Sequence, residues 1–516
     1  MIKYEEPPMT PSTQNTPPQP SARHFARSKP ALVLGAAIVA VWLVMLGVLV
    51  KRVYFPQVSG LISLPKVEDL AGIMGGDRWM SIYYKGRKIG FSSSSLVQEG
   101  FGFRLREKTF MRLNIMDQIQ EIRTLTGCRV TPDFKLISFD FHLMSGLVNF
   151  YLSGEVSPDQ ISLKTRTGGR ESQTVLPIKE PPYMPLALGP YLAMGNPAPG
   201  TTLQLPLFDP ATMAYKTTTI KVLPRENVTI GGITYRAIPV VMDFMGIKVK
   251  SWIDETGRTL KEEGLLGFKL VLSTDTEATA DIAGSGGPDL LAAAAVPVKN
   301  SIKNPRETTY VKIKLGGIKL SDYNLNDQRQ KLTGDELEIR KEEIYWSKTP
   351  IRTYSGKDME ADLAPNLLIQ SDAPEIIEQS RQILGDEHMA QAAARKLNIW
   401  VFQNLKKHPT LSVPNALETL QTKAGDCNEH AALLTALLRA AGIPARVAVG
   451  LVYFRDKFYY HAWCDAYVGR WISMDATLGQ FPADATHISF ARGGLEQQVV
   501  VGGLIGRLEA EVLESK

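Results

Sequence analysis

The chain has 516 residues, more than one hydrophobic core usually organises, so we expect two or three folded domains. Its 58 Lys and Arg nearly balance 53 Asp and Glu, giving a formal net charge of +5 without any block of like charges, which argues against a nucleic-acid partner. The three cysteines, Cys128, Cys427 and Cys464, are too few for a disulfide scaffold.

The first fifty residues divide into a polar head and an apolar span. Residues 1–30 are rich in proline, and we expect them to be disordered. Residues 31–50 carry no charge and consist mainly of Ala, Val and Leu, a length that crosses a bilayer as one helix. No small-residue cleavage pattern follows closely. We therefore expect an uncleaved, single-pass transmembrane helix.

The charges around this span do not fix its orientation. Three basic residues precede it and three follow it, namely Arg23, Arg27 and Lys29 against Lys51, Arg52 and Lys66. Long domains cross a membrane largely regardless of their charge. We therefore expect the head in the cytoplasm and the bulk of the chain in the periplasm or another extracytoplasmic space.

Residues 77–280 show short β-rich runs separated by turn signals. Leu136–Leu143 and Leu147–Leu152, for example, are separated by Ser145-Gly146. The pattern predicts a mostly antiparallel β domain. Residues 283–300 are rich in Gly and Ala and read as a linker. Residues 305–360 then contain β-rich runs that could form a small connecting module.

Residues 374–516 form the last predicted domain, and it begins with helical spacing of apolar residues. Two helices are expected, with a break near Gly385-Asp386. A further helix is expected after Asp426, which is a good N-cap, and Glu429 completes a capping-box pattern. Cys427 then lies in the first turn, where the helix dipole and backbone amides favour a thiolate. The alternative is a small cysteine packed at a helix start.

Downstream of this helix, three runs predict strands at Val447–Phe454, Phe458–Val468 and Trp471–Met474. His461 and Asp475 would then lie on neighbouring strands and could share a hydrogen bond. A two-residue turn at Gly469-Arg470 would pair Asp475 with Cys464, on the face opposite His461. An odd-length turn or a bulge is therefore needed to bring His461 and Asp475 onto one face.

A cysteine, a histidine and an aspartate in this setting are typical of nucleophilic catalysis. The histidine would take the thiol proton and later deliver one to a leaving amine, while the aspartate would orient the histidine and stabilise its charge. Taken singly, His461 is better explained as a core histidine and Asp475 as a turn residue.

The segment Thr422–Thr477 resembles the transglutaminase-like superfamily. The motifs Ala-Gly-Asp-Cys ending at Cys427, His461-Ala-Trp and Trp-Ile-Ser-Met-Asp475-Ala-Thr follow the pattern of that family in order. The family commonly has proline where this chain has Ala476. The resemblance implies a papain-like α+β core with Cys427, His461 and Asp475 as the catalytic triad.

Zinc binding is an alternative, because Cys427-x-x-His430 and His461-x-x-Cys464 imitate paired zinc-ligand spacings. Residues three apart on a strand point to opposite sides, however, and Asp475 would have no role. We therefore expect no metal and no cofactor. The oligomeric state cannot be read from the sequence.

The sequence thus predicts an α+β protein with one N-terminal transmembrane helix, a mostly antiparallel β domain and a C-terminal papain-like transglutaminase core. Its expected activity is thiol acyl transfer or amide hydrolysis through a Cys427 acyl-enzyme, on glutamine side chains or peptide bonds. The expected partner is a protein or peptide, for which the cell envelope is one location. The alternative is a non-catalytic envelope interaction protein that retains this fold.

Overall fold

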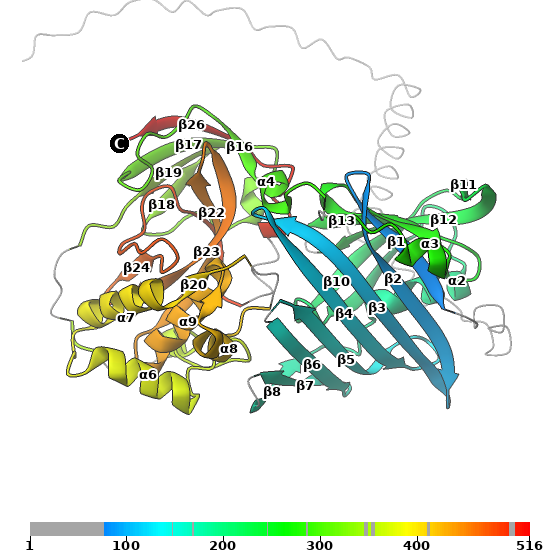
Figure 1. Cartoon of the computed structure of the whole chain (residues 1–516), viewed down its shortest axis with the longest axis horizontal. Coiled ribbons are helices and arrows are strands. Elements are labelled where there is room, and N and C mark those ends of the chain that lie inside the picture. The colour runs from blue at the N-terminus through cyan, green and yellow to red at the C-terminus, as the bar shows by residue number, and fades with distance from the viewer. Residues whose placement is uncertain are drawn as a thin grey trace, which may run out of the picture. The chain divides into compact units, whose positions relative to one another are not determined.

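The computed structural model describes residues 77–146, 148–167, 170–244, 246–284, 287–344, 349–351, 357–409, 413–494 and 501–516. The predicted head at 1–30 and the predicted transmembrane helix at 31–50 lie outside these residues. None of the helices in the described ranges is both long enough and apolar enough to cross a membrane. The described part of the chain is mostly β and contains two large sheets (Figure 1).

The first sheet lies within the predicted β-rich domain, and its neighbouring strands run antiparallel, as in the pairing of β3 with β2 and β4. On β3, Phe103 and Leu105 are buried whereas Arg106 is exposed, the two-residue period of a strand with one face in the core. Fourteen of its 15 described strands follow the spatial order β8 (Arg170–Pro177), β7 (Gln160–Thr167), β6 (Val148–Val156), β5 (Leu136–Ser145), β4 (Gln118–Val130), β3 (Gly102–Ile115), β2 (Arg87–Glu99), β1 (Arg78–Tyr84), β15 (Phe268–Ser273), β14 (Thr259–Glu263), β13 (Ile247–Ile253), β12 (Ile233–Phe244), β10 (Ala214–Val222) and β9 (Thr202–Asp209), with β11 (Glu226–Ile230) paired to β12.

Short helices accompany this part of the chain: η2 (Pro185–Ala187), α2 (Leu188–Gly195), η3 (Leu265–Gly267), α3 (Asp275–Thr279) and α4 (Leu290–Ala294). A cavity of about 240 Å³ is lined by residues of β1–β3, β14, β15 and α2, among them Glu107 and Glu262. Ser92 Oγ donates to Glu107 Oε1 (3.0 Å), and Ser251 Oγ donates to Glu262 Oε2 (2.9 Å). Burial raises the pKa of both carboxyl groups, and these hydrogen bonds oppose the rise.

The second sheet joins strands from distant parts of the sequence. β16 lies inside the predicted linker at 283–300, yet it pairs antiparallel with β23 and parallel with β26. Strands β17–β19, from the predicted connecting module, belong to the same sheet, so both segments contribute to the sheet that carries the candidate site. Its spatial order is β18 (Gln330–Thr333), β19 (Glu336–Arg340), β17 (Tyr310–Gly316), β26 (Glu509–Ser515), β16 (Val296–Lys299), β23 (Lys457–Tyr467), β22 (Ala445–Phe454) and β25 (Ile488–Arg492), with β24 (Trp471–Met474) paired to β23.

Helix α9 (Cys427–Ala440) packs against β22 and β23, and three other helices pack around it (Figure 1). These are α6 (Pro374–Leu384), α7 (Ala390–Asn404) and α8 (Ala416–Thr422). The predicted break near Gly385 is confirmed between α6 and α7. The remaining short elements are η4 (Leu320–Asp322), α5 (Lys357–Glu360), β20 (Lys406–Lys407) and β21 (Ala424–Gly425).

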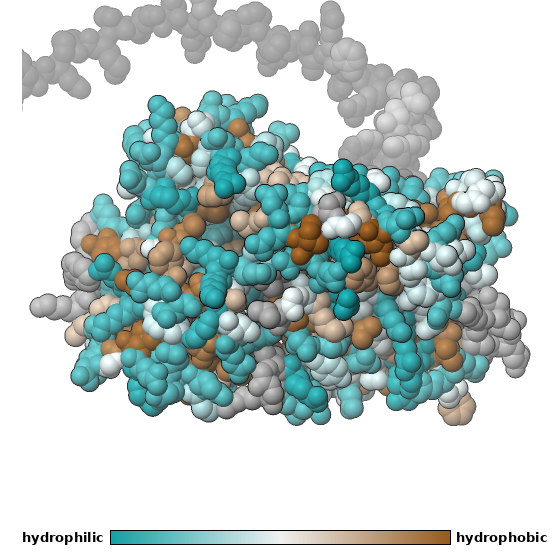
Figure 2. All heavy atoms as spheres, viewed as in Figure 1, coloured by the Kyte–Doolittle hydropathy of each residue, from teal (hydrophilic) through white to brown (hydrophobic). Residues whose placement is uncertain are grey.

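The hydrophobic core beside the candidate site is formed by these helices and the second sheet. Leu433, Leu434 and Leu437 of α9 are fully buried, as are Val449 of β22 and Phe458 of β23. In contrast, the face of the molecule in Figure 2 is covered mainly by hydrophilic side chains, with hydrophobic ones in small scattered groups. Because its leucines are buried against the sheet and the neighbouring helices, α9 is packed on several sides.

The carboxyl groups of Glu107 and Glu262 in the cavity of the first sheet make the free energy of unfolding depend on pH. The variant Glu262→Gln tests this dependence. Because the folded pKa of Glu262 is raised, the unfolded chain ionises first, and stability falls as pH rises from about 4.5 through the folded pKa. We expect Glu262→Gln to remove this loss, so that urea unfolding at pH 4 and pH 8 shows a gain in stability over the wild type only at pH 8.

Glu263→Gln is the matched control. A hydrogen bond from Lys261, aided by Lys269, lowers the pKa of Glu263, so its contribution to stability is present above about pH 4.5 and is lost as pH falls. This variant should be slightly less stable than the wild type at pH 8. A loss in both variants at pH 8 would contradict the argument.

Candidate functional site

Cys427 is the first residue of α9, as the sequence predicts. Asp426 caps the helix and accepts the amide of Asn428 (2.8 Å), while Glu429 Oε2 accepts the amide of Asp426 (2.8 Å), so the capping box is confirmed. Gly425 allows this geometry, because a Cβ at that position would lie 2.4 Å from Glu429 Cβ. The local sequence thus fixes the position of the half-buried Cys427 side chain.

The electrostatics around Cys427 differ from the sequence-based expectation of a thiolate. Burial, followed by the charge of Asp426, raises the pKa of the Cys427 thiol well above its ordinary value. A hydrogen bond from the backbone amide of Ala462 opposes this rise, and Glu429 and Asp475 add to it. Burial and the three nearby carboxylates together outweigh the Ala462 amide, and this balance favours a neutral thiol in the resting site.

His461 and Asp475 meet directly. His461 Nε2 lies 2.7 Å from Asp475 Oδ2, and His461 lies on β23, one residue before the amide that contacts Cys427. A carboxylate oxygen can only accept, so Nε2 carries the proton of this hydrogen bond. Nδ1 is then the nitrogen of a neutral His461 that can accept a proton. Trp463 stacks beside the imidazole, with ring centroids 6.2 Å apart.

The turn between β23 and β24 explains how the two side chains share a face. Tyr467 pairs with Trp471, so three residues, Val468, Gly469 and Arg470, form the turn. When this register is continued past Met474, Asp475 lies opposite Trp463. Trp463 is two residues from His461 and therefore points to the same face of the sheet. The odd-length turn required by the sequence argument is therefore present, and Asp475 does not pair with Cys464.

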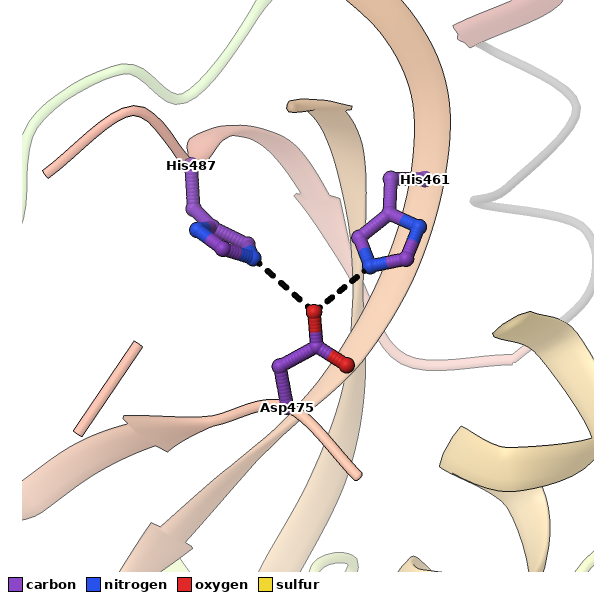
Figure 3. Close-up of side chains that lie close together, drawn as sticks. All are labelled: His461, Asp475 and His487. Carbon is purple, nitrogen blue, oxygen red and sulfur yellow. Dashed lines mark hydrogen bonds and ion pairs between the residues drawn. The ribbon is translucent and has the colours of Figure 1, made fainter. Parts of the chain in front are cut away.

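A second histidine on Asp475 was not predicted from the sequence. His487 Nε2 lies 3.1 Å from Asp475 Oδ2, and its Nδ1 lies 3.2 Å from Asp484 Oδ1 (Figure 3). His487, Asp475 and Asp484 are fully buried, and His461 nearly so. His487 immediately precedes β25, in a stretch with no recognisable motif, so only the pairing of β25 with β22 reveals its position.

Tyr460 also lies beside the thiol. Its hydroxyl donates to Asn428 Oδ1 (2.9 Å), which links β23 to the first turn of α9. Burial, followed by the charge that Cys427 carries once it is ionised, raises the pKa of Tyr460 well above its ordinary value. Tyr460 and Asn428 therefore lie close to Cys427 at the start of α9.

The four zinc ligands suggested by the sequence, Cys427, His430, His461 and Cys464, do not lie around one common point. Among the described residues, the histidines, cysteines and acidic side chains close enough to hold a metal are His461, Asp475 and His487, a set without either cysteine. Tetrahedral zinc with ligand bonds of 2.0–2.1 Å would hold its ligands about 3.3 Å apart. The 2.7 Å between His461 and Asp475 instead fits a hydrogen bond. His430 Nδ1 donates to the Asp426 carbonyl (2.7 Å), and Cys464 is fully buried, the core roles expected of them.

Comparisons with known proteins agree with the C-terminal assignment. Residues 377–476 match the model of the transglutaminase-like superfamily. No match was found among curated proteins. Among solved structures, a candidate cysteine protease from Cytophaga hutchinsonii is 16% identical, with TM-score 0.28, over 40% of this chain and 87% of its own. A β-barrel-like protein of unknown function from Brucella abortus is 13% identical, with TM-score 0.32, over 38% of this chain and 95% of its own.

These TM-scores are too low to assign a shared fold, so the family-model match is the finding that bears on function. The matched segment contains Cys427, His461 and Asp475. The C-terminal part of this chain is thus similar to transglutaminase-like proteins.

The neutral thiol predicts a particular pH dependence of alkylation. Because the thiolate is the reactive form and the pKa of Cys427 is raised, its reaction with iodoacetamide should accelerate about tenfold per pH unit without a plateau below pH 9. Mass spectrometry of the Cys427 peptide at timed intervals measures this rate. Cys128 and Cys464 serve as internal controls, because burial raises the pKa of each to about 12. A plateau below pH 7 would instead mean a preformed thiolate.

Proposed function

We propose that this protein is a membrane-anchored thiol acyltransferase or amide hydrolase whose C-terminal domain has a papain-like transglutaminase core. Cys427 is the nucleophile, His461 the general base and acid, and Asp475 the residue that orients His461. The 2.7 Å hydrogen bond between His461 Nε2 and Asp475 Oδ2 carries this proposal, because it reserves Nδ1 for the thiol proton.

In the first half of the reaction, the Cys427 sulfur attacks the carbonyl carbon of an amide while its proton moves to His461 Nδ1. The new S–C bond turns the carbonyl into a tetrahedral oxyanion. Backbone amides at the start of α9 are suited to stabilise this charge, since the first turn presents donors and the positive end of the helix dipole. His461 then protonates the leaving nitrogen as the C–N bond breaks, and a thioester remains on Cys427.

In the second half, the thioester passes its acyl group to an acceptor. Water or a primary amine attacks the thioester carbon, His461 takes the proton of the acceptor, and the thiol leaves with a proton returned from His461. Water gives deamidation or peptide hydrolysis, whereas an amine gives a new amide bond. The buried Asp475 carboxylate remains ionised throughout, because His461 and His487 outweigh burial and hold its pKa well below the ordinary range.

The proposal is tested on the full-length protein with a glutamine-containing peptide, with and without a primary amine. Mass spectrometry should show loss of ammonia to water, replacement by the amine, or cleavage of the peptide. Cys427→Ala should reduce the rate by about 10³-fold or more, and Asp475→Asn by roughly 10²–10⁴-fold, because nucleophile and orienting acid act as one unit.

The matched control is Cys128→Ala, which removes a buried thiol from the first sheet and should leave the rate unchanged. A thiol-directed probe that forms an acyl-enzyme gives a second test independent of the peptide. If Cys427 remains unlabelled in the folded protein and Cys427→Ala behaves as wild type in cells, the chain is a non-catalytic interaction protein.

The membrane anchor is part of the proposal and rests on the uncharged run at 31–50. With the short head in the cytoplasm, the candidate site would meet protein or peptide substrates outside it. An alkaline phosphatase fused after Lys516 should then be active, since that reporter needs the periplasm, while a cytoplasmic reporter at the same place should be inactive. The reverse pattern, or recovery of the chain from the soluble fraction, would contradict this topology.

A further inference from the structure

His487 shares one carboxylate oxygen with the proposed catalytic base. His461 and His487 approach Asp475 Oδ2 from two sides, at 2.7 Å and 3.1 Å, and their ring centroids lie 5.7 Å apart (Figure 3). The other oxygen, Asp475 Oδ1, accepts the backbone amides of Thr477 (2.7 Å) and Leu478 (3.0 Å). Oδ2 is therefore the oxygen for which the two histidines compete.

The partners of His487 determine how many protons it carries. Nε2 faces Asp475 Oδ2, and Nδ1 faces Asp484 Oδ1 and the Asp484 carbonyl oxygen, each at 3.2 Å. Ionised carboxylates and carbonyls only accept hydrogen bonds. Both ring nitrogens of His487 must therefore donate, which makes the buried ring an imidazolium.

Asp484 is held ionised and in place by a set of donors of its own. Arg306 Nη1 and Gln480 Nε2 each donate to Asp484 Oδ2 at 2.8 Å, and Thr486 donates to Oδ1 through its amide (2.9 Å) and hydroxyl. These groups and His487 outweigh burial and lower the pKa of Asp484. Burial by itself would lower the pKa of His487. The carboxylates of Asp475 and Asp484 outweigh this effect and raise the pKa.

We propose that His487 is a charged positioning residue that shares Asp475 with His461 and competes with it for the one carboxylate oxygen that would stabilise the imidazolium of His461 during the reaction. This inference rests on the proposed function of His461 as the general base. When His461 takes the thiol proton, Asp475 Oδ2 has to serve two imidazolium rings instead of one. The arrangement with the proton on Cys427 is therefore favoured at rest.

The charges around the two rings are consistent with this assignment. Asp475 and Asp484 carry one negative charge each, and His487 and the half-buried Arg306 one positive charge each, so these four groups are neutral together. The other titratable or charged groups nearby are Asp426, Cys427, Glu429 and His430 on α9, Tyr460 on β23, and Arg329, which donates to the Ala483 and Asp484 carbonyls.

The variant His487→Gln tests this role, because its amide can still donate to Asp475 but carries no charge. We expect the acid limb of the kcat/KM–pH profile of the full-length protein to move up by about one pH unit, a tenfold shift. His388→Gln, which removes an exposed histidine, is the control and should leave the profile unchanged.

NMR of ¹⁵N-histidine-labelled full-length protein provides a second measurement that needs neither activity nor a variant. Both nitrogens of His487 should carry protons at pH 7. A bare nitrogen on His487 at pH 7, or an unchanged acid limb in folded His487→Gln, would overturn the inference. If no substrate is turned over while His487 is doubly protonated, the proposed function fails and the charge on His487 stands.

Discussion

The arrangement of the candidate site depends on one buried carboxylate. Asp475 is fully inaccessible to solvent, and an ion in such a place is stable only when each oxygen is hydrogen-bonded. Two backbone amides hold Oδ1, so the carboxyl plane is set by the chain itself, and Oδ2 is presented to the histidines. The orientation of His461, and with it the nitrogen available to Cys427, follows from this one group.

The support for Asp475 extends into strands remote in sequence. Arg306 binds Asp484, and Gln330 forms a two-way hydrogen bond with the backbone of Ser489, two residues after His487. Both come from the region that the sequence suggests is a separate connecting module. The surroundings of His487 are therefore held by residues 178 and 159 positions upstream of the groups that they bind, and the structural unit around the candidate site is larger than the segment with family resemblance.

The sequence predicts the local features well. The capping box fixes the start of α9 at Cys427, and apolar alternation predicts β22, β23 and β24 to within about two residues at each end. Both depend on neighbouring residues, which the sequence displays directly. The neutral state of Cys427 and the role of His487 depend on distant side chains brought together by strand pairing. A single sequence does not display such contacts, and helix position alone suggested the opposite charge for the thiol.

The three-residue turn from Val468 to Arg470 has a consequence for how this chain can change over evolution. Strand residues alternate between faces, so the side on which Asp475 emerges is set by the pairing of Tyr467 with Trp471 and not by the number of residues between them. Residues inserted into or deleted from the turn would preserve that side as long as this pair is kept. A one-residue slip of the pairing would turn the aspartate away from His461 while leaving both strands intact. The turn is therefore free to vary in length between homologues, whereas the register of the two strands is not.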